Sequence, residues 1–159
     1  MSRRAAGFTL MELMAVVAVI AILALMAVPS LMQRMARQQV SEALAIADIA
    51  KEPIAAAWKA HQPLPADNAA AGLPGPEKIV SNYVAALQVD HGAIHLTFGN
   101  NANGSLKGKT LTLRPAVVED APVVPVAWVC GHAAVPGKMT AQGENRTDLD
   151  KALLPLPCR

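Results

Sequence analysis

Hydrophobic and polar positions divide the chain into three zones. Residues 13–33 carry no charged side chain and are mostly apolar. From there to about residue 60, apolar side chains recur at every third or fourth position, which indicates a helix with one apolar face. After residue 62, short stretches rich in Val, Ile, Leu and Thr alternate with segments rich in Pro, Gly and Asn, a pattern typical of strands and turns. The pattern predicts an α+β chain with one long N-terminal helix.

The uncharged zone is long enough to cross a membrane, since a spanning helix needs about 20 apolar residues. Glu12 is a lone carboxylate at its edge, with Arg4 the nearest preceding cation. An ionisable group at membrane depth costs about 2–3 kcal/mol or more, so it usually has a partner or a function. The alternative is that Glu12 sits at headgroup level and stays hydrated. Position alone leaves both interpretations open.

The second zone predicts a continuation of the same helix, with Val40, Ala43, Leu44, Ala47, Ile54 and Trp58 on one face. We expect the helix to end near His61, because prolines 63 and 65 follow directly. Proline inside a helix removes one backbone hydrogen bond. Pro29 and Pro53 are therefore expected to bend this helix.

The third zone predicts a loop at residues 63–76 and then four strands, at residues 79–89, 93–98, 110–114 and 123–130. Residues 100–104 predict a turn between the second and third strands. Gly92, between His91 and His95, favours a turn there too. Four antiparallel strands packed on the apolar face of the helix are the expected architecture.

Charge changes the picture mainly at the N-terminus. The 159 residues include 14 Lys and Arg against 12 Asp and Glu, and without Arg3 and Arg4 the two counts are equal at 12. The small positive net charge therefore does not indicate a nucleic-acid-binding face. Cations before an apolar stretch favour a cytoplasmic N-terminus, with the rest of the chain outside.

Cys130 and Cys158 would then lie in an oxidising compartment, where an even count fits one disulfide. Two unpaired thiols are the alternative. An ordinary secretory signal does not fit the N-terminus, because the apolar stretch is too long and no Ala-x-Ala site follows it directly. A plain membrane anchor explains the length of the stretch and leaves Glu12 unexplained.

The run Gly7-Phe8-Thr9-Leu10-Met11-Glu12-Leu13 closely resembles the type III signal of type IV prepilins. The resemblance implies a pilin fold, a leader at residues 1–7, cleavage by a prepilin peptidase between Gly7 and Phe8, and methylation of the Phe8 amine. It further implies a transmembrane and filament-core helix at 8–33, the amphipathic half of that helix at 34–61, and a globular domain at 62–159 closed by a C-terminal disulfide loop.

The resemblance also gives Glu12 a partner, the Phe8 amine of a neighbouring subunit in a filament. Two opposite charges attract strongly at low dielectric, and leaving each buried alone costs several kcal/mol. Such a pair therefore specifies how neighbouring subunits are aligned along the filament. By the same resemblance, the segment around Pro29 unwinds in the filament, and Cys130 and Cys158 bound the surface loop of type IVa pilins.

The function implied is that of the major subunit of a type IVa pilus, serving adhesion, twitching motility or DNA uptake. Its partners would be other copies of itself, the prepilin peptidase, the assembly platform, minor pilins, the inner membrane, and DNA or host surfaces. The alternatives are a minor pilin or type II secretion pseudopilin, and a membrane-anchored periplasmic binding domain or enzyme. No catalytic residue, metal site or cofactor is predicted, since the sequence has no nucleophile elbow, phosphate loop or paired carboxylates. The expected location is the inner membrane before assembly and the extracellular pilus afterwards.

Overall fold

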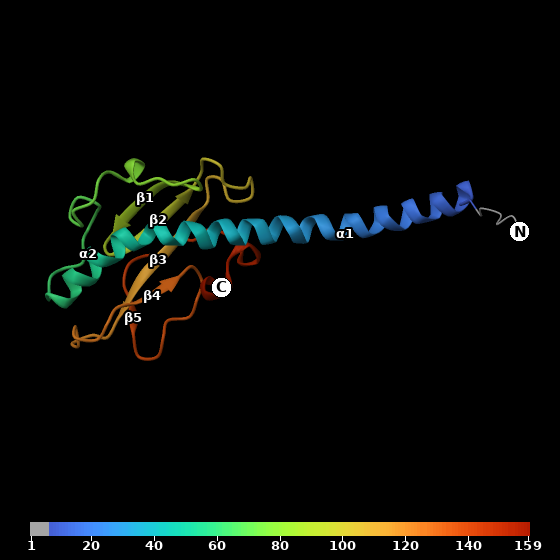
Figure 1. Ribbon diagram of the computed structural model, residues 1–159. Helices are drawn as coiled ribbons and strands as arrows, with labels where there is room; N and C mark the ends of the chain where they lie inside the picture. Colours follow the sequence, from blue (N-terminus) through green and yellow to red (C-terminus); the bar gives the residue numbers. More distant parts are fainter. Residues whose placement is uncertain (1–6) are drawn as a thin grey trace, which may run out of the picture. The chain divides into compact units, whose positions relative to one another are not determined.

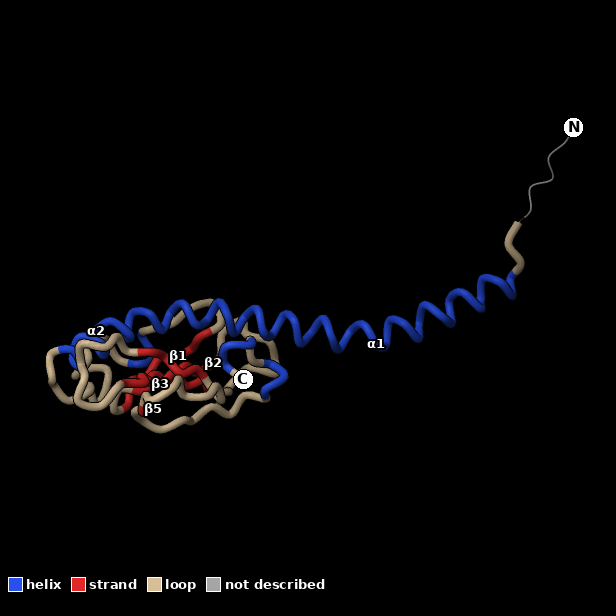
Figure 2. The backbone as a smooth tube through the Cα atoms, turned by 90° about the horizontal axis from the view of Figure 1, so that it is seen from below, coloured by secondary structure: helices blue, strands red, loops and turns tan. Residues whose placement is uncertain are grey.

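A computed structural model describes residues 7–159, apart from the side chains of Ala27 and Pro29 (Figures 1 and 2). Helix α1 (Leu10–Ala43) is followed by a 3-10 turn (Leu44–Ala47) and by α2 (Asp48–Lys59). The strands are β1 (Val84–Asp90), β2 (Ala93–Phe98), β3 (Thr110–Val117), β4 (Ala127–Cys130) and β5 (Thr140–Ala141). Three further 3-10 turns are Pro76–Lys78, Lys151–Leu153 and Leu156–Cys158. The chain divides into two compact units, one ending at Arg34 and the other beginning at Met35.

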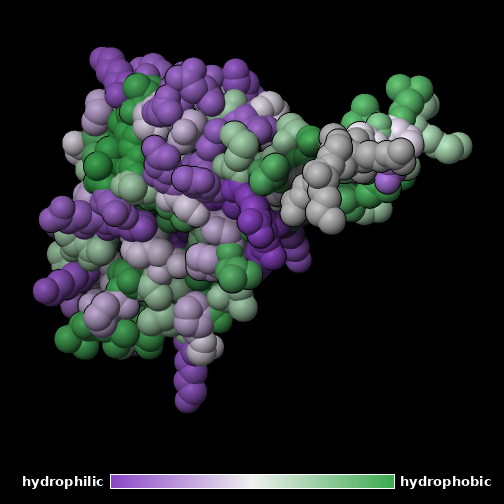
Figure 3. Space-filling view, turned by 45° about the vertical axis from the view of Figure 1, so that its right-hand side comes forward, coloured by the Kyte–Doolittle hydropathy of each residue, from purple (hydrophilic) through white to green (hydrophobic). Residues whose placement is uncertain are grey.

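The first unit holds the N-terminal part of α1, and every side chain described in it is exposed. Figure 3 shows hydrophobic side chains, in green, along this helix. The most apolar window of the helical stretch Leu10–Lys59 has a mean hydropathy of 2.7, so this helix is long and apolar enough to cross a membrane. A helix that is hydrophobic on all sides is stable only when lipid or other helices cover it.

The second unit begins with the amphipathic part of the helix. Its buried positions follow a three- and four-residue spacing, as the sequence predicts: Ala36, Val40, Ala43, Ala47, Ala50 and Ile54. Four of these six are alanines, whose small side chains let the helix approach the sheet closely. The helix type changes at Leu44–Ala47, whereas Pro53 lies inside α2. A bend at Pro29 or Pro53 stays a prediction.

Helix α2 ends as expected, close to His61. The amide of Gln62 donates to the carbonyl of Ala57 and that of His61 donates to the carbonyl of Trp58, at 2.9 and 3.0 Å. His61 adopts a left-handed conformation with φ of 56°. This pair of bonds with a left-handed residue between them is a Schellman motif, which satisfies the last carbonyls of a helix.

The sheet has the order β1-β2-β3-β4, all antiparallel, with β5 paired to the end of β3. The four predicted strands are confirmed, and β2 has the predicted bounds. His91 and Gly92 form the turn between β1 and β2, with φ values of 47° and 85°. Two positive φ values match the tight hairpin turn that the twist of antiparallel strands prefers.

Four strand boundaries differ from the prediction, the smallest difference being that the first strand ends at Asp90 instead of residue 89. The first strand begins at Val84 instead of residue 79, because Pro76 starts a 3-10 turn there. The last predicted strand begins at Ala127 instead of 123, since Pro122 and Pro125 cannot donate to a sheet. Strand β3 continues to Val117, beyond the predicted residue 114.

The core of the second unit lies between the helix and one face of the sheet, as Figure 2 shows. Alternate strand residues point to it, and Leu87, Leu96, Phe98 and Leu111 are among its largest fully buried side chains. The other face of the sheet carries polar side chains, including His95 and Thr112, and the C-terminal segment crosses it. The predicted α+β architecture, a long helix on a four-stranded antiparallel sheet, is confirmed.

Candidate functional site: an N-terminal motif and a disulfide-closed loop

Gly7 and Phe8 lie just before α1, separated from it by Thr9, and both are exposed. A side chain at Gly7 would meet no atom within 4 Å, so the backbone at this bond is open on that side. Arg3 and Arg4 of the expected leader lie outside the described residues. The bond expected to be cleaved is therefore accessible and lies outside regular secondary structure.

Thr9 and Glu12 form a capping box at the start of α1. The Glu12 amide donates to Thr9 Oγ1 at 3.2 Å, while the Thr9 amide and hydroxyl donate to Glu12 Oε2 at 3.3 and 3.2 Å. The first helical bond runs from the Leu13 amide to the Thr9 carbonyl. This reciprocal arrangement satisfies amides that the helix itself leaves free.

Thr9 was not among the functional residues expected from the sequence, although a threonine three residues before a glutamate is a recognised helix-start pattern. The structure thus gives the Glu12 carboxylate a local partner within its own chain. Its expected partner, the Phe8 amine of a neighbouring subunit, is not tested by a single chain. The expected pair would use the same carboxylate, four residues after Phe8.

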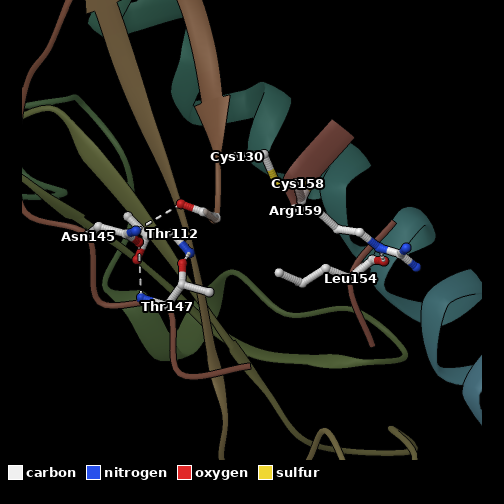
Figure 4. Close-up of a disulfide and its surroundings, with 8 residues drawn as sticks. Thr112, Cys130, Asn145, Thr147, Leu154, Cys158 and Arg159 are labelled. Carbon is white, nitrogen blue, oxygen red and sulfur yellow. Dashed lines mark hydrogen bonds between the residues drawn. A yellow bond between two sulfur atoms is a disulfide. The ribbon is translucent and has the colours of Figure 1, made fainter. Parts of the chain in front are cut away.

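The second site is the loop closed by Cys130 and Cys158, which form the expected disulfide (Figure 4). Cys158 is fully buried in the core of the second unit. The amide of His132 donates to the Cys158 carbonyl at 3.0 Å. Gly131 has φ of 56°, and a side chain there would lie 2.6 Å from the same carbonyl oxygen, so only glycine fits.

Residues 140–148, here called the strap, cross the polar face of the sheet. At one end the Gln142 amide donates to the Pro115 carbonyl at 2.8 Å. Further along, the Arg146 amide donates to Thr112 Oγ1, and the Thr112 amide donates to Thr147 Oγ1, both at 3.0 Å. The Asn145 side chain donates to the Gly131 carbonyl and accepts from the Thr147 amide (Figure 4). The strap is therefore held by side chains that satisfy free backbone groups.

His95 is buried beneath the strap. Its Nδ1 lies 2.9 Å from Thr112 Oγ1, and its Nε2 is buried without a hydrogen-bond partner among the described residues. Burial lowers the pKa of His95, and the nearby Arg146 guanidinium lowers that pKa further. Asp90 and Glu144 oppose this effect. The lowered pKa means that burial disfavours the charged form of the His95 ring.

An ion-pair cluster flanks the strap. The Arg146 guanidinium contacts Asp90 Oδ2 and lies 3.0 Å from Glu144 Oε2. The hydrogen bond from His91 is the largest cause of the lowered pKa of Asp90, and Arg146 lowers that pKa too. The cluster links the β1–β2 turn to the strap.

The loop between Cys130 and β5 is held less firmly than the strap. Residues 132–139 are mostly exposed, and no hydrogen bond of their side chains is seen in the described structure. The C-terminal end is anchored instead: Arg37 Nε donates to the Ala152 carbonyl at 2.7 Å, and Arg159 Nε to that of Leu154 at 3.0 Å. The loop thus combines a fixed frame with one free segment.

Among residues 7–159 no group of three His, Cys, Asp or Glu side chains is placed to hold a metal ion. The two sites show a capped helix start next to an exposed segment, and a disulfide that closes the C-terminal region of the domain.

Comparison with known proteins assigns both parts of the chain. Residues 36–159 match the family model described as pilin of bacterial filaments, and residues 2–28 match the prokaryotic N-terminal methylation motif. The chain therefore belongs to the pilin family.

Its relatives carry more specific names. It is 33% identical over 165 aligned positions to the type IV major pilin protein PilE1 of Neisseria gonorrhoeae, covering 100% of this chain and 89% of the relative. It is 34% identical to a type IV major pilin protein PilE of the same species, covering 100% and 96%. A fimbrial protein of Neisseria meningitidis serogroup B is 32% identical over 168 positions, with 100% and 96% covered. The resemblance to type IV pilins expected from residues 7–13 thus extends over the full chain.

Proposed function

We propose that this chain is the major structural subunit of a type IV pilus. The observation that carries the proposal is the full-length similarity to type IV major pilins, which covers the N-terminal motif and the globular unit together. The N-terminal methylation motif and the exposed apolar helix support it independently. Neither feature is needed by a soluble domain that acts alone.

A prepilin peptidase cuts the precursor between Gly7 and Phe8, and the Phe8 amine is then methylated. The capping box is compatible with this cleavage, since all its hydrogen bonds lie between Thr9 and Glu12. Removal of residues 1–7 leaves these bonds intact. The helix therefore keeps its start when the leader is lost.

The helix serves first as an anchor in the inner membrane, with the N-terminus cytoplasmic and the globular unit outside. On assembly the same apolar surface leaves lipid and packs against the helices of other copies. Association of apolar helices out of lipid is driven by van der Waals packing, which tolerates a shift of register more easily than a buried charge does. The pairing of Glu12 with the Phe8 amine of a neighbour supplies register, because a misaligned subunit would leave both charges buried and unpaired.

The assembled pilus then serves adhesion, twitching motility or DNA uptake. The further partners are the assembly platform, minor pilins, and DNA or host surfaces. The exposed segment 132–139 and the frame around it present one surface through which a filament could contact such targets.

Electron microscopy of filaments sheared from cells that carry this chain, with mass spectrometry of the purified subunit, tests the proposal. We expect abundant filaments whose main protein begins at methylated Phe8. A matched Gly7→Val precursor, which adds a side chain at the scissile bond, is expected to stay uncleaved in the membrane and to form no filaments.

A mature subunit confined to rare filament tips would indicate a minor pilin, and one confined to the cell envelope would indicate a pseudopilin. A chain that keeps residues 1–7 and never polymerises would contradict the proposal and favour a plain membrane-anchored domain.

A further inference from the structure

Two apolar side chains in the second unit are far more exposed than the rest. Val123 is 85% exposed and Leu156 is 80% exposed, whereas Val80 and Ile49 are 51% and 46% exposed. Scattered exposed apolar residues are ordinary, but apolar side chains in prominent, structured positions mark contact surfaces. Each of these two lies in a defined setting.

Val123 borders a groove of about 290 Å³ beside the end of α2. Its walls are Ala55, Trp58 and Lys59 from the helix and residues 122–126 from the loop between β3 and β4. Two of those five loop residues are prolines and three are valines, so this wall is apolar and its backbone is restricted. The groove is large enough to admit an aliphatic side chain.

Leu156 stands between two prolines on a 3-10 turn, Leu156–Cys158. The turn is fixed by the disulfide at Cys158 and by the bond from the Cys158 amide to the Pro155 carbonyl, at 3.0 Å. A protruding side chain on a rigid turn loses little conformational entropy on binding. Leu156 is therefore a protruding apolar side chain on a rigid turn, and it is here called the knob.

Groove and knob lie at opposite ends of the second unit. Arg37, near the start of its helical part, contacts Ala152, close in sequence to the knob, whereas Trp58 lines the groove near the end of α2. From residue 37 to residue 58 the helix rises about 30 Å. Leu156 therefore cannot reach the groove of its own chain. Leu156 of a second copy, placed head to tail with the first, can reach it.

In this head-to-tail placement, the charges beside the groove of one copy are opposite in sign to the charges beside Leu156 of the other. Glu119 and Asp120 are exposed just before the groove loop, and Lys151 and Arg159 are exposed on either side of Leu156. Two different, complementary patches on one molecule produce a heterologous contact, which continues from copy to copy and does not close a symmetric dimer.

We propose that Leu156 of one subunit inserts into the groove lined by Trp58 and residues 122–126 of the next, and that this contact joins globular units along the filament. The inference rests on the proposed function, because it requires that copies of this chain polymerise. It identifies a contact between globular units that is separate from the packing of the N-terminal helices.

Charge substitutions at the two exposed positions test this contact. In cells producing the full chain, Val123→Asp and Leu156→Asp are each expected to reduce the yield of sheared filaments about tenfold or more, since each would bury an unpaired carboxylate. Val80→Asp, at another exposed valine, serves as the matched control and is expected to keep the wild-type yield. Immunoblots of membrane fractions check that the subunit level is unchanged.

A reciprocal pair shows whether the two positions meet. Val123→Lys combined with Leu156→Glu is expected to restore filaments that either substitution alone removes, and a carbodiimide that couples amines to carboxylates should join these subunits into a ladder. Wild-type filament yields in both aspartate variants would overturn the inference, as would failure of the pair to restore filaments and to cross-link. If the unmodified chain itself forms no filaments, the proposed function is wrong, and this contact falls with it.

Discussion

Glu12 lies where two interactions compete for one carboxylate. Within the chain it closes the capping box with Thr9, at distances of 3.2 and 3.3 Å. In the proposed filament it meets the Phe8 amine of a neighbour. A capping interaction needs a hydrogen-bond acceptor, whereas the intersubunit pair needs a negative charge, so substitutions at this residue can separate the two roles.

We therefore expect Glu12→Gln and Glu12→Ala both to give processed, membrane-resident subunits that assemble poorly. Gln retains the capping acceptor but not the charge. Thr9→Ala removes the cap at about 1 kcal/mol and keeps the charge, so its filaments are expected to form. Filament yield after shearing, relative to subunit in the membrane, is the measurement. Normal filaments from Glu12→Gln and none from Thr9→Ala would reverse the assignment and make capping the main role.

At the scale of single elements, His95 on β2 makes the packing of the strap dependent on pH. His95 is 4% exposed, and it faces Arg146 and Glu144 on the strap and Asp90 on β1. Burial lowers its pKa in the folded state below the ordinary value of 6.5. Between those two values the unfolded chain binds more protons than the folded chain, so the free energy of unfolding falls as pH falls.

The full chain in detergent should accordingly lose stability on acidification below about pH 6.5, with the loss levelling off once pH is below the folded-state pKa of His95. Hydrogen exchange of the strap amides and thermal unfolding followed by circular dichroism measure this. His95→Gln is expected to flatten the dependence, while His132→Gln, on the free segment, should leave it unchanged. An identical slope in the His95→Gln protein would contradict the role of this side chain.

Elements with local signals were predictable from sequence, and elements held by distant bonds were not. The amphipathic helix, its end near His61 and strand β2 follow from spacing and from prolines close by. The first and last strands of the predicted set came out too long, because hydrophobic content outweighed Pro76, Pro122 and Pro125 in the prediction. The strap has no periodicity, since bonds such as that of the Arg146 amide to Thr112 join residues 34 apart in sequence.

The candidate site shows the same division. Gly7, Phe8 and Glu12 were expected from one short motif, and the disulfide from the number of cysteines and the family resemblance. Thr9 was not predicted as a functional residue, although the sequence carries the Thr-x-x-Glu spacing of a capping box. The burial of His95 had no signal in sequence, because it depends on a segment about 50 residues later folding across the sheet.

For the whole molecule, the disulfide joins the end of β4 to the last turn of the chain across 28 residues. Closing a loop of this length restricts the unfolded chain and contributes about 3 to 4 kcal/mol in the chain-entropy model. Cys130→Ser with Cys158→Ser is expected to lower the melting temperature by a corresponding amount and to expose the strap to proteolysis. Because the knob at Leu156 is fixed by the same bond, filament yield should fall as well.

Reducing agent gives the internal control for this pair. It should lower the stability of the unmodified chain toward that of the double serine protein and leave the latter unchanged. Equal melting temperatures of the two proteins under oxidising conditions would show that burial of residues 149–158 alone holds the C-terminal region.

The free segment 132–139 sets where the molecule can tolerate change. Its two ends are held by the disulfide and by β5, and its own side chains take no part in that frame. Doubling the length of such a loop adds only about 0.6 kcal/mol of closure entropy. Natural changes of sequence and length should therefore accumulate at this position. A grafted peptide tag should be tolerated there as well, because the displayed sequence can be exchanged while sheet, strap and helix stay the same.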